Sequence, residues 1–235
     1  MHPRDLLASS ARLSHELLAI IHDEPPSLDR IAAGLADAAA AAVPLPDHDV
    51  AVTLRVDRTR LVRAATTRVA RELVTLEGRL GAGPTVQALD EIRVVGSGDR
   101  GPVPDAWSDA VARAGYHDVV AAPVVIAGSA AGAVTLHRRA PGDGEDDREV
   151  VALIAHQAAL VVEAGRRLLQ LRDAVASRDV IGQAKGILMS RYGIDAATAF
   201  GRLVEASQDM NVKLVDIARW YVTDQDGTAP APRPS

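Results

Sequence analysis

Residues 177–222, SRDVIGQAKGILMSRYGIDAATAFGRLVEASQDMNVKLVDIARWYV, contain residue types that are absent from the rest of the chain. Both lysines, the single asparagine, the single phenylalanine and both internal methionines lie here. Elsewhere arginine carries the positive charge, a composition typical of a coding bias against lysine, asparagine and phenylalanine. Residues that persist against such a bias indicate a functional requirement, and chance clustering is the alternative explanation.

Helical spacing divides this stretch into three short helices. The first ends at Tyr192-Gly193, where glycine suits a helix C-terminus, while Asp195 is placed to cap the second helix and Asn211 to cap the third. A minimal three-helix bundle is therefore expected. Its core is predicted to contain Val175, Ile181, Ala184, Leu188, Met189, Ala199, Phe200, Leu203, Ala206, Met210, Leu214, Ile217, Ala218 and Tyr221.

Seven polar residues fall outside these apolar stripes. From Leu168 to Val222 the chain has seven lysines and arginines against six aspartates and glutamates, so this segment is barely cationic. Affinity for a polyanion would have to come from a few placed groups, and specificity from hydrogen bonds to unpaired bases. Singly each side chain is an ordinary solvated group, but together their spacing favours a binding surface. They are Arg178, Gln183, Lys185, Arg191, Gln208, Asn211 and Lys213.

The stretch resembles the ANTAR domain of bacterial transcription antiterminators over about 55 residues, and its motif residues include Ala184-Lys185-Gly186 and Ala199-Phe200. The resemblance implies a three-helix RNA-binding unit that, usually as a dimer, recognises paired stem-loops in nascent transcripts and prevents a terminator hairpin from forming. It makes Lys185, Arg191, Asn211 and Lys213 the leading candidates for RNA contact, with Arg178, Gln183 and Gln208 as secondary ones. Asn211 has a second, structural role as a helix cap, and both roles can hold together.

A long helix is expected to begin near Asp146 and to run into this stretch. Heptad spacing produces a short and partly polar seam, which leaves two interpretations open: one helix packing on its own domain, or a dimeric coiled coil. The seam residues are Ile154, Val161, Leu168 and Val175 at one position, and Gln157, Ala164, Leu171 and Arg178 at the other.

The preceding residues are typical of an α+β domain built on an antiparallel sheet. The spacing predicts helices at 5–22, 28–43 and 104–114, a hairpin of strands 50–56 and 61–66, a short strand at 92–95, and a second hairpin of strands 119–126 and 131–138.

Three segments of this region resemble, in order, a GAF sensory domain of the kind that is joined to ANTAR. They are LEGRLGAGPTVQALDEIRVV at 76–95, WSDAVARAGYHDVVAAPVVIAGSAAGAVTLHRR at 107–139 and EDDREVVALIAHQAALVV at 145–162. Thr85 replaces a cysteine found in many relatives, and an aromatic residue near Gly144 is absent, which argues against a thiol-based or aromatic-stacked ligand. The resemblance implies a small-molecule pocket of unknown ligand, or a dimerisation scaffold.

Six arginines crowd the first hairpin and its exit. We interpret them as a solvent-facing strand surface, because arginine replaces lysine throughout most of the chain. The alternative is that some of them hold a phosphate-bearing ligand in the GAF domain. They are Arg55, Arg58, Arg60, Arg63, Arg68 and Arg71.

Composition argues against several other classes of protein. The net charge of −5 argues against a protein that coats nucleic acid non-specifically, and the absence of cysteine removes disulfides and thiolate metal sites. Gly96 to Gly101 satisfies GxGxxG, but Pro102-Val103-Pro104 separates it from the next helix, so a dinucleotide site is not predicted. We therefore expect no catalytic residues, no metal site, no cofactor and no enzyme activity. With no signal peptide and no membrane-spanning run, the chain is expected to be cytoplasmic and not to bind a membrane.

The predicted architecture is α+β: a GAF-like antiparallel sheet flanked by helices, a long connecting helix, and an all-α three-helix ANTAR bundle. The expected parts are an N-terminal helix at 1–24, a GAF-like sensor or dimerisation domain at 25–165, an ANTAR domain at 166–223 whose first helix continues the last GAF helix, and a disordered tail at 224–235.

This architecture predicts a homodimeric transcription antitermination regulator, paired through its GAF and connecting helices. It would bind paired RNA stem-loops under the control of the GAF domain, in which a small-molecule ligand is possible. The alternative is a ligand-regulated protein–protein interaction or dimerisation module that does not bind RNA.

Overall fold

A computed structural model describes residues 27–43, 47–57, 60–99, 103–140 and 145–223. The helix expected at 5–22, the tail at 224–235 and Arg58 lie outside the described residues. The described chain forms two compact units that divide between Arg167 and Leu168. Its elements are α2 (Leu28–Ala42), β1 (His48–Arg55), β2 (Leu61–Ala65), α3 (Arg68–Leu80), α4 (Pro84–Glu91), β3 (Val95–Gly96), α5 (Asp105–Arg113), β4 (Asp118–Ile126), β5 (Ser129–Arg138), α6 (Glu145–Tyr192), α7 (Ala196–Met210) and α8 (Leu214–Thr223).

The first unit is built on one five-stranded sheet with the order β2-β1-β5-β4-β3. Every neighbouring pair of strands is antiparallel, and both predicted hairpins, β1–β2 and β4–β5, are present. The α+β class predicted from the sequence is therefore confirmed. The second hairpin is tighter than expected, because Ala127 and Gly128 alone form its turn. Both have positive φ, as a two-residue type I′ turn requires.

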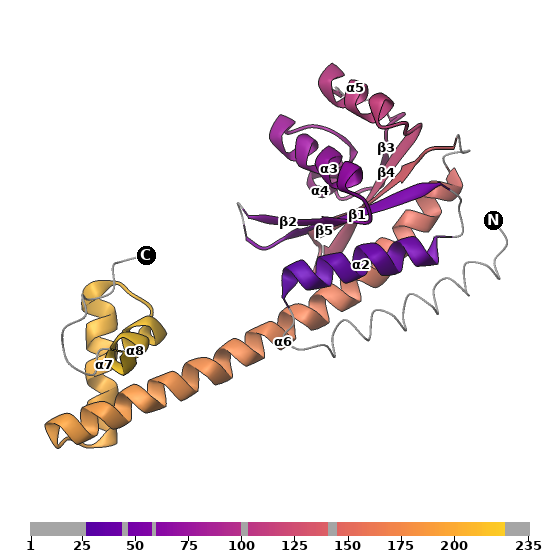
Figure 1. Ribbon diagram of the computed structural model, residues 1–235. Coiled ribbons are helices and arrows are strands. Elements are labelled where there is room, and N and C mark those ends of the chain that lie inside the picture. Colours follow the sequence, from indigo (N-terminus) through magenta and orange to yellow (C-terminus); the bar gives the residue numbers. More distant parts are fainter. Residues whose placement is uncertain (1–26, 44–46, 58–59, 100–102, 141–144, 224–235) are drawn as a thin grey trace. The chain divides into compact units, whose positions relative to one another are not determined.

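Helices cover both faces of this sheet (Figure 1): α2 and the first part of α6 pack on one face, and α3, α4 and α5 on the other. In β1 the alternating Val50, Val52 and Leu54 join the core formed with α2 and α6, while Ala51 and Thr53 between them are buried as well. Because aromatic residues are scarce, small aliphatic side chains fill both layers.

Two helices on the second face were not predicted. No element was predicted between 67 and 91, where α3 and α4 lie. The overlooked signals are Thr67, whose hydroxyl accepts a hydrogen bond from the Ala70 N–H at 3.3 Å, and Gly81, which ends α3 in the left-handed conformation. The strand expected at 92–95 was also misplaced, because Ile92 turns to positive φ after α4 and leaves only Val95–Gly96 paired.

Glu77 is a buried acid that links α3 to the start of α4. Its Oε2 accepts hydrogen bonds from the backbone N–H groups of Thr85 at 2.6 Å and Val86 at 3.3 Å. It thereby replaces the side-chain cap that Gly83 cannot supply. Gly83 is needed at that place, since a Cβ there would lie 2.5 Å from the Glu77 Cγ and its φ is +125°. Burial raises the pKa of Glu77 to about 7 despite these hydrogen bonds.

The raised pKa makes stability depend on pH in a defined direction. The stabilisation that goes with a protonated Glu77 is fully present below the carboxyl's unfolded value of 4.5, and it is lost as pH rises through about 7. Glu77→Gln removes this ionisation. We expect the stability of the variant relative to wild type to increase between about pH 5 and about pH 8 in urea unfolding experiments. If the difference in unfolding free energy between Glu77→Gln and wild type is the same at about pH 5 and at about pH 8, Glu77 does not titrate in this range.

Candidate RNA-binding surface

The last part of α6 forms a three-helix unit with α7 and α8, drawn in orange and yellow in Figure 1. Its buried core is small and aliphatic, and Ile181, Met189, Ala206, Met210, Leu214 and Tyr221 pack against it partly buried, as predicted. The fully buried members are Ala184, Leu188, Ala199, Leu203, Val212, Ile217 and Ala218.

Two predicted core residues are instead exposed. Phe200 is 43% exposed and Val175 is 62% exposed, so both predictions were wrong. On α7 the buried line runs through Ala199 and Leu203, and Phe200 lies about 100° around the helix from Ala199. Val175 lies on α6 before the part of that helix that the core of this unit covers.

One of the two predicted caps is confirmed. The Asp195 side chain accepts a hydrogen bond from the Thr198 N–H at 2.7 Å, which also lowers the pKa of Asp195. Asn211, however, does not cap α8. It ends α7 in the left-handed conformation with φ of +51°, and the Lys213 carbonyl accepts the first hydrogen bonds of α8. Within the described residues, no hydrogen bond involves the Asn211 side-chain amide, so its backbone is structural while its side chain projects outward.

The seven residues predicted to contact RNA lie in more than one place. Gln208, Asn211 and Lys213 are all exposed at the turn between α7 and α8. Arg191 lies in the last turn of α6, just before the start of α7, and the 15 residues of α7 span about 22 Å from there to that turn. The structure therefore does not bring these four residues into a single cluster.

The other three predicted residues lie earlier on α6. Lys185 is half-buried, whereas Arg178 and Gln183 are exposed. Arg178 and Lys185 are seven residues apart and so share a face of the helix, but Gln183 projects about 160° away from Lys185. Gln183 instead joins Arg191 in a shallow cavity of about 740 Å³ between α6 and Val222 of α8. Gly186, Ile187 and Ser190 complete its walls, giving amide, hydroxyl and guanidinium groups beside an apolar floor.

A pair of stacked side chains in the same unit was not predicted from the sequence. The Arg202 guanidinium lies over the ring of Tyr192, 5.1 Å from its centroid, and Tyr192 is exposed. Exposed aromatic rings and arginine planes are the surfaces on which unpaired bases stack. Tyr192 had been assigned only to a helix end and Phe200 only to a core. The sequence held a signal for each residue. Tyr192 stands beside Gly193 at the end of a helix, and Phe200 falls outside the helical line of Ala199 and Leu203.

Substitutions at Asn211 separate its backbone role from its side chain. Asn211→Ala should destabilise the turn by about 1 kcal/mol, because alanine tolerates positive φ less well than asparagine, whereas Asn211→Gly should be neutral or stabilising. Hydrogen–deuterium exchange of the Val212 and Ile217 amides measures the local effect. Equal protection in both variants would contradict a left-handed residue at this position.

Within the described ranges, no helix is apolar over a length sufficient to cross a bilayer. In the same part of the chain, no group of three or more histidine and acidic side chains is placed to hold a metal ion.

Comparisons with known proteins match both units. An ANTAR domain model matches residues 169–220, and a GAF domain model matches residues 27–163. A nitrate regulatory protein from Klebsiella oxytoca is 31% identical over 77 residues, which is 33% of this chain and 19% of that protein. The match thus spans about a fifth of that relative.

One solved structure shows the fold of the first unit, and a second is similar to the chain. The GAF domain of a phosphoenolpyruvate-protein phosphotransferase from Acinetobacter superposes with a TM-score of 0.50 and 14% identity, covering 72% of this chain and 99% of that one. The corresponding domain from Coxiella burnetii has a TM-score of 0.49 and 13% identity, covering 71% and 98%. Residues 169–220 match the ANTAR domain, and because the GAF model spans more than half of the chain, the protein belongs to the GAF-domain family.

Proposed function

We propose that the protein is an RNA-binding transcription antitermination regulator whose ANTAR domain binds paired stem-loops in nascent RNA under the control of its GAF domain. The observation that carries the proposal is the ANTAR match at 169–220 on a separate three-helix unit with its own core. The proposal includes a cytoplasmic location, since nascent bacterial transcripts are made there.

The chemistry of the exposed groups supports recognition of loops rather than of regular duplex. Lys213 and Arg178 offer charges for phosphates, while the amides of Gln183 and Asn211 can hydrogen-bond the edges of unpaired bases. The stacked Tyr192 and Arg202 add a flat surface on which a base can rest. Because the unit has little net positive charge, individual hydrogen bonds, phosphate contacts and stacking of this kind must supply most of the affinity for RNA.

The RNA proposal is tested with a tandem stem-loop RNA and the variant Lys185→Gln/Lys213→Gln, which removes both positive charges and keeps polar side chains. We expect weaker binding. We also expect the slope of log binding constant against log salt concentration to become shallower by about one for each lost phosphate contact. Fluorescence anisotropy at several salt concentrations measures both. Asn211→Gly should also weaken binding, with its folding intact.

The matched control is Arg30→Gln/Arg93→Gln, which removes the same charge from exposed positions of the GAF unit. It should bind RNA as wild type does. If wild type and both double variants bind the tandem stem-loop equally weakly and with equal salt dependence, the RNA proposal fails. A regulated protein–protein interaction module would then be the better account.

We also propose that the protein is a homodimer that pairs through its GAF and connecting helices. The predicted seam needs correction, because Ile154 and Val161 are buried in the core of the first unit. The exposed leucine and valine residues of α6 are Leu160, Leu171 and Val175, which lie within about 60° of one another around the helix. Leu171 is 65% exposed and Val175 is 62% exposed. Neighbouring exposed apolar side chains of this kind are typical of a surface that a partner covers.

The dimer proposal predicts that Leu171→Glu/Val175→Glu shifts the protein to a monomer, since two charges would be placed in the paired surface. Sedimentation velocity measures the change. Gln170→Glu/Ala176→Glu introduces the same charges at exposed positions elsewhere around α6 and should leave the dimer intact. A wild-type protein that sediments as a monomer at micromolar concentration would contradict the proposal.

A further inference from the structure

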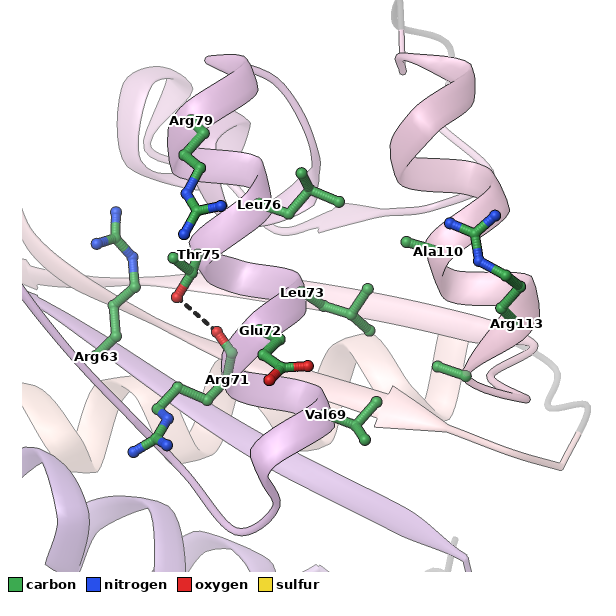
Figure 2. A pocket seen from close by; sticks show the side chains of 11 residues that line it. Arg63, Val69, Arg71, Glu72, Leu73, Thr75, Leu76, Arg79, Ala110 and Arg113 are labelled. Carbon is green, nitrogen blue, oxygen red and sulfur yellow. Dashed lines mark hydrogen bonds between the residues drawn. The ribbon is translucent and has the colours of Figure 1, made fainter.

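A cavity of about 730 Å³ lies against α3 on the helical face of the first unit, between β2 and α5 (Figure 2). Its volume is within the range of roughly 300–1,000 Å³ that is common for small-molecule sites. Four arginines from three elements line it: Arg63 of β2, Arg71 and Arg79 of α3, and Arg113 of α5. Two of them, Arg63 and Arg71, belong to the group that the sequence analysis assigned to a solvent-facing strand surface.

Three of these arginines lie on the same side of α3. Arg71, Thr75 and Arg79 recur every four residues and so lie on one face of α3. Arg63 reaches the same place from β2, and Figure 2 shows it on the side of α3 where Arg71, Thr75 and Arg79 lie. Gly78 leaves room for the Arg63 guanidinium, which would have to shift if a Cβ lay there, 2.3 Å from the Arg63 Nη2.

These arginines lack the partners that other arginines of the unit have. Arg93, Arg138, Arg139 and Arg148 each pair with a carboxylate. Among the described residues, by contrast, no ion pair involves any of the four arginines that line the cavity, and the Arg63 Nε is buried without a hydrogen bond.

The acids nearby do not offset this charge. Glu72, the one acid in the cavity wall, pairs with Arg68 outside it at 2.7 Å. Glu77 attracts Arg63, but its buried carboxyl has a pKa raised to about 7 and is therefore only partly charged near neutral pH. Grouped positive charges without anions repel one another, and a bound anion would relieve the repulsion.

The other half of the cavity is apolar. Val69, Leu73 and Leu76 of α3 face Ala110 of α5 across it, as Figure 2 shows, and Val69 is 41% exposed. This apolar shelf lies beside the arginine group within one cavity. A ligand that fits both halves carries an anionic group for the guanidiniums and an apolar body for the shelf, and arginine is well suited to bind phosphate through paired hydrogen bonds.

We propose that this cavity binds a phosphorylated small molecule whose phosphate contacts Arg63, Arg71 and Arg79 and whose apolar part lies on the shelf between α3 and α5. The site is separate from the ANTAR surface, and the proposal does not depend on RNA binding.

Isothermal titration calorimetry of the full chain with 1-naphthyl phosphate tests the site, because this probe combines a phosphate with an apolar body. We expect it to bind more tightly than inorganic phosphate or 1-naphthol, each of which fills only one half. Arg71→Ala/Arg79→Ala should weaken binding by about tenfold for each lost charged hydrogen bond. Gly78→Ala should weaken it as well by displacing Arg63.

The matched control Arg30→Ala/Arg93→Ala removes two exposed arginines of the same unit that do not line the cavity. It should bind the probe as wild type does. The proposal is overturned if 1-naphthyl phosphate does not bind at millimolar concentration, if inorganic phosphate binds equally well, or if the control loses as much affinity. It is also overturned if Arg71→Ala/Arg79→Ala weakens binding of stem-loop RNA and not of the probe, since the arginines would then form a nucleic-acid surface.

Discussion

The buried ion pair between Arg138 and Asp147 is the interaction on which the arrangement of the first unit depends. The Arg138 Nη1 donates to both carboxylate oxygens at 2.8 and 3.1 Å, and Asp147 is fully buried. The pair fixes the first turn of α6 to the last residue of β5, so that Val150, Val151 and Ile154 meet the sheet. Removing one partner would leave a buried charge, which costs roughly 3–5 kcal/mol. From this anchored start α6 continues to Tyr192, where it belongs to the ANTAR unit.

Sequence patterns predicted the parts of the fold in which hydrophobic spacing and turn residues agree. The two hairpins, α2, α5 and the Asp195 cap all follow from local signals of this kind. Helix α3 was overlooked because its exposed face is rich in arginine and its buried residues include a glutamate, Glu77, whose role depends on the distant start of α4. Phe200 was misassigned because hydrophobicity alone does not distinguish a core residue from a residue held at the surface for contact.

The candidate sites depended even more on three-dimensional placement. The resemblance to ANTAR named the polar residues, but only the structure separates the exposed turn with Asn211 and Lys213 from the cavity with Gln183 and Arg191. Likewise, Arg63 and Arg79 are 16 residues apart in the sequence, and the fold places both at one cavity beside α3. The two proposals thus concern surfaces of different chemistry: one of mixed amides, charges and stacked rings, and one of arginines and apolar side chains around α3.

The central claim is that the ANTAR unit contacts unpaired bases of RNA. Ultraviolet cross-linking of the full chain to a tandem stem-loop RNA, with the linked peptides identified by mass spectrometry, tests it most directly. The account predicts cross-links at Tyr192 and Phe200, and in the peptides that contain Gln183 and Asn211, which disappear when the loop bases are replaced by continuous duplex. Cross-links confined to the GAF unit, or none between residues 178 and 213, would contradict it.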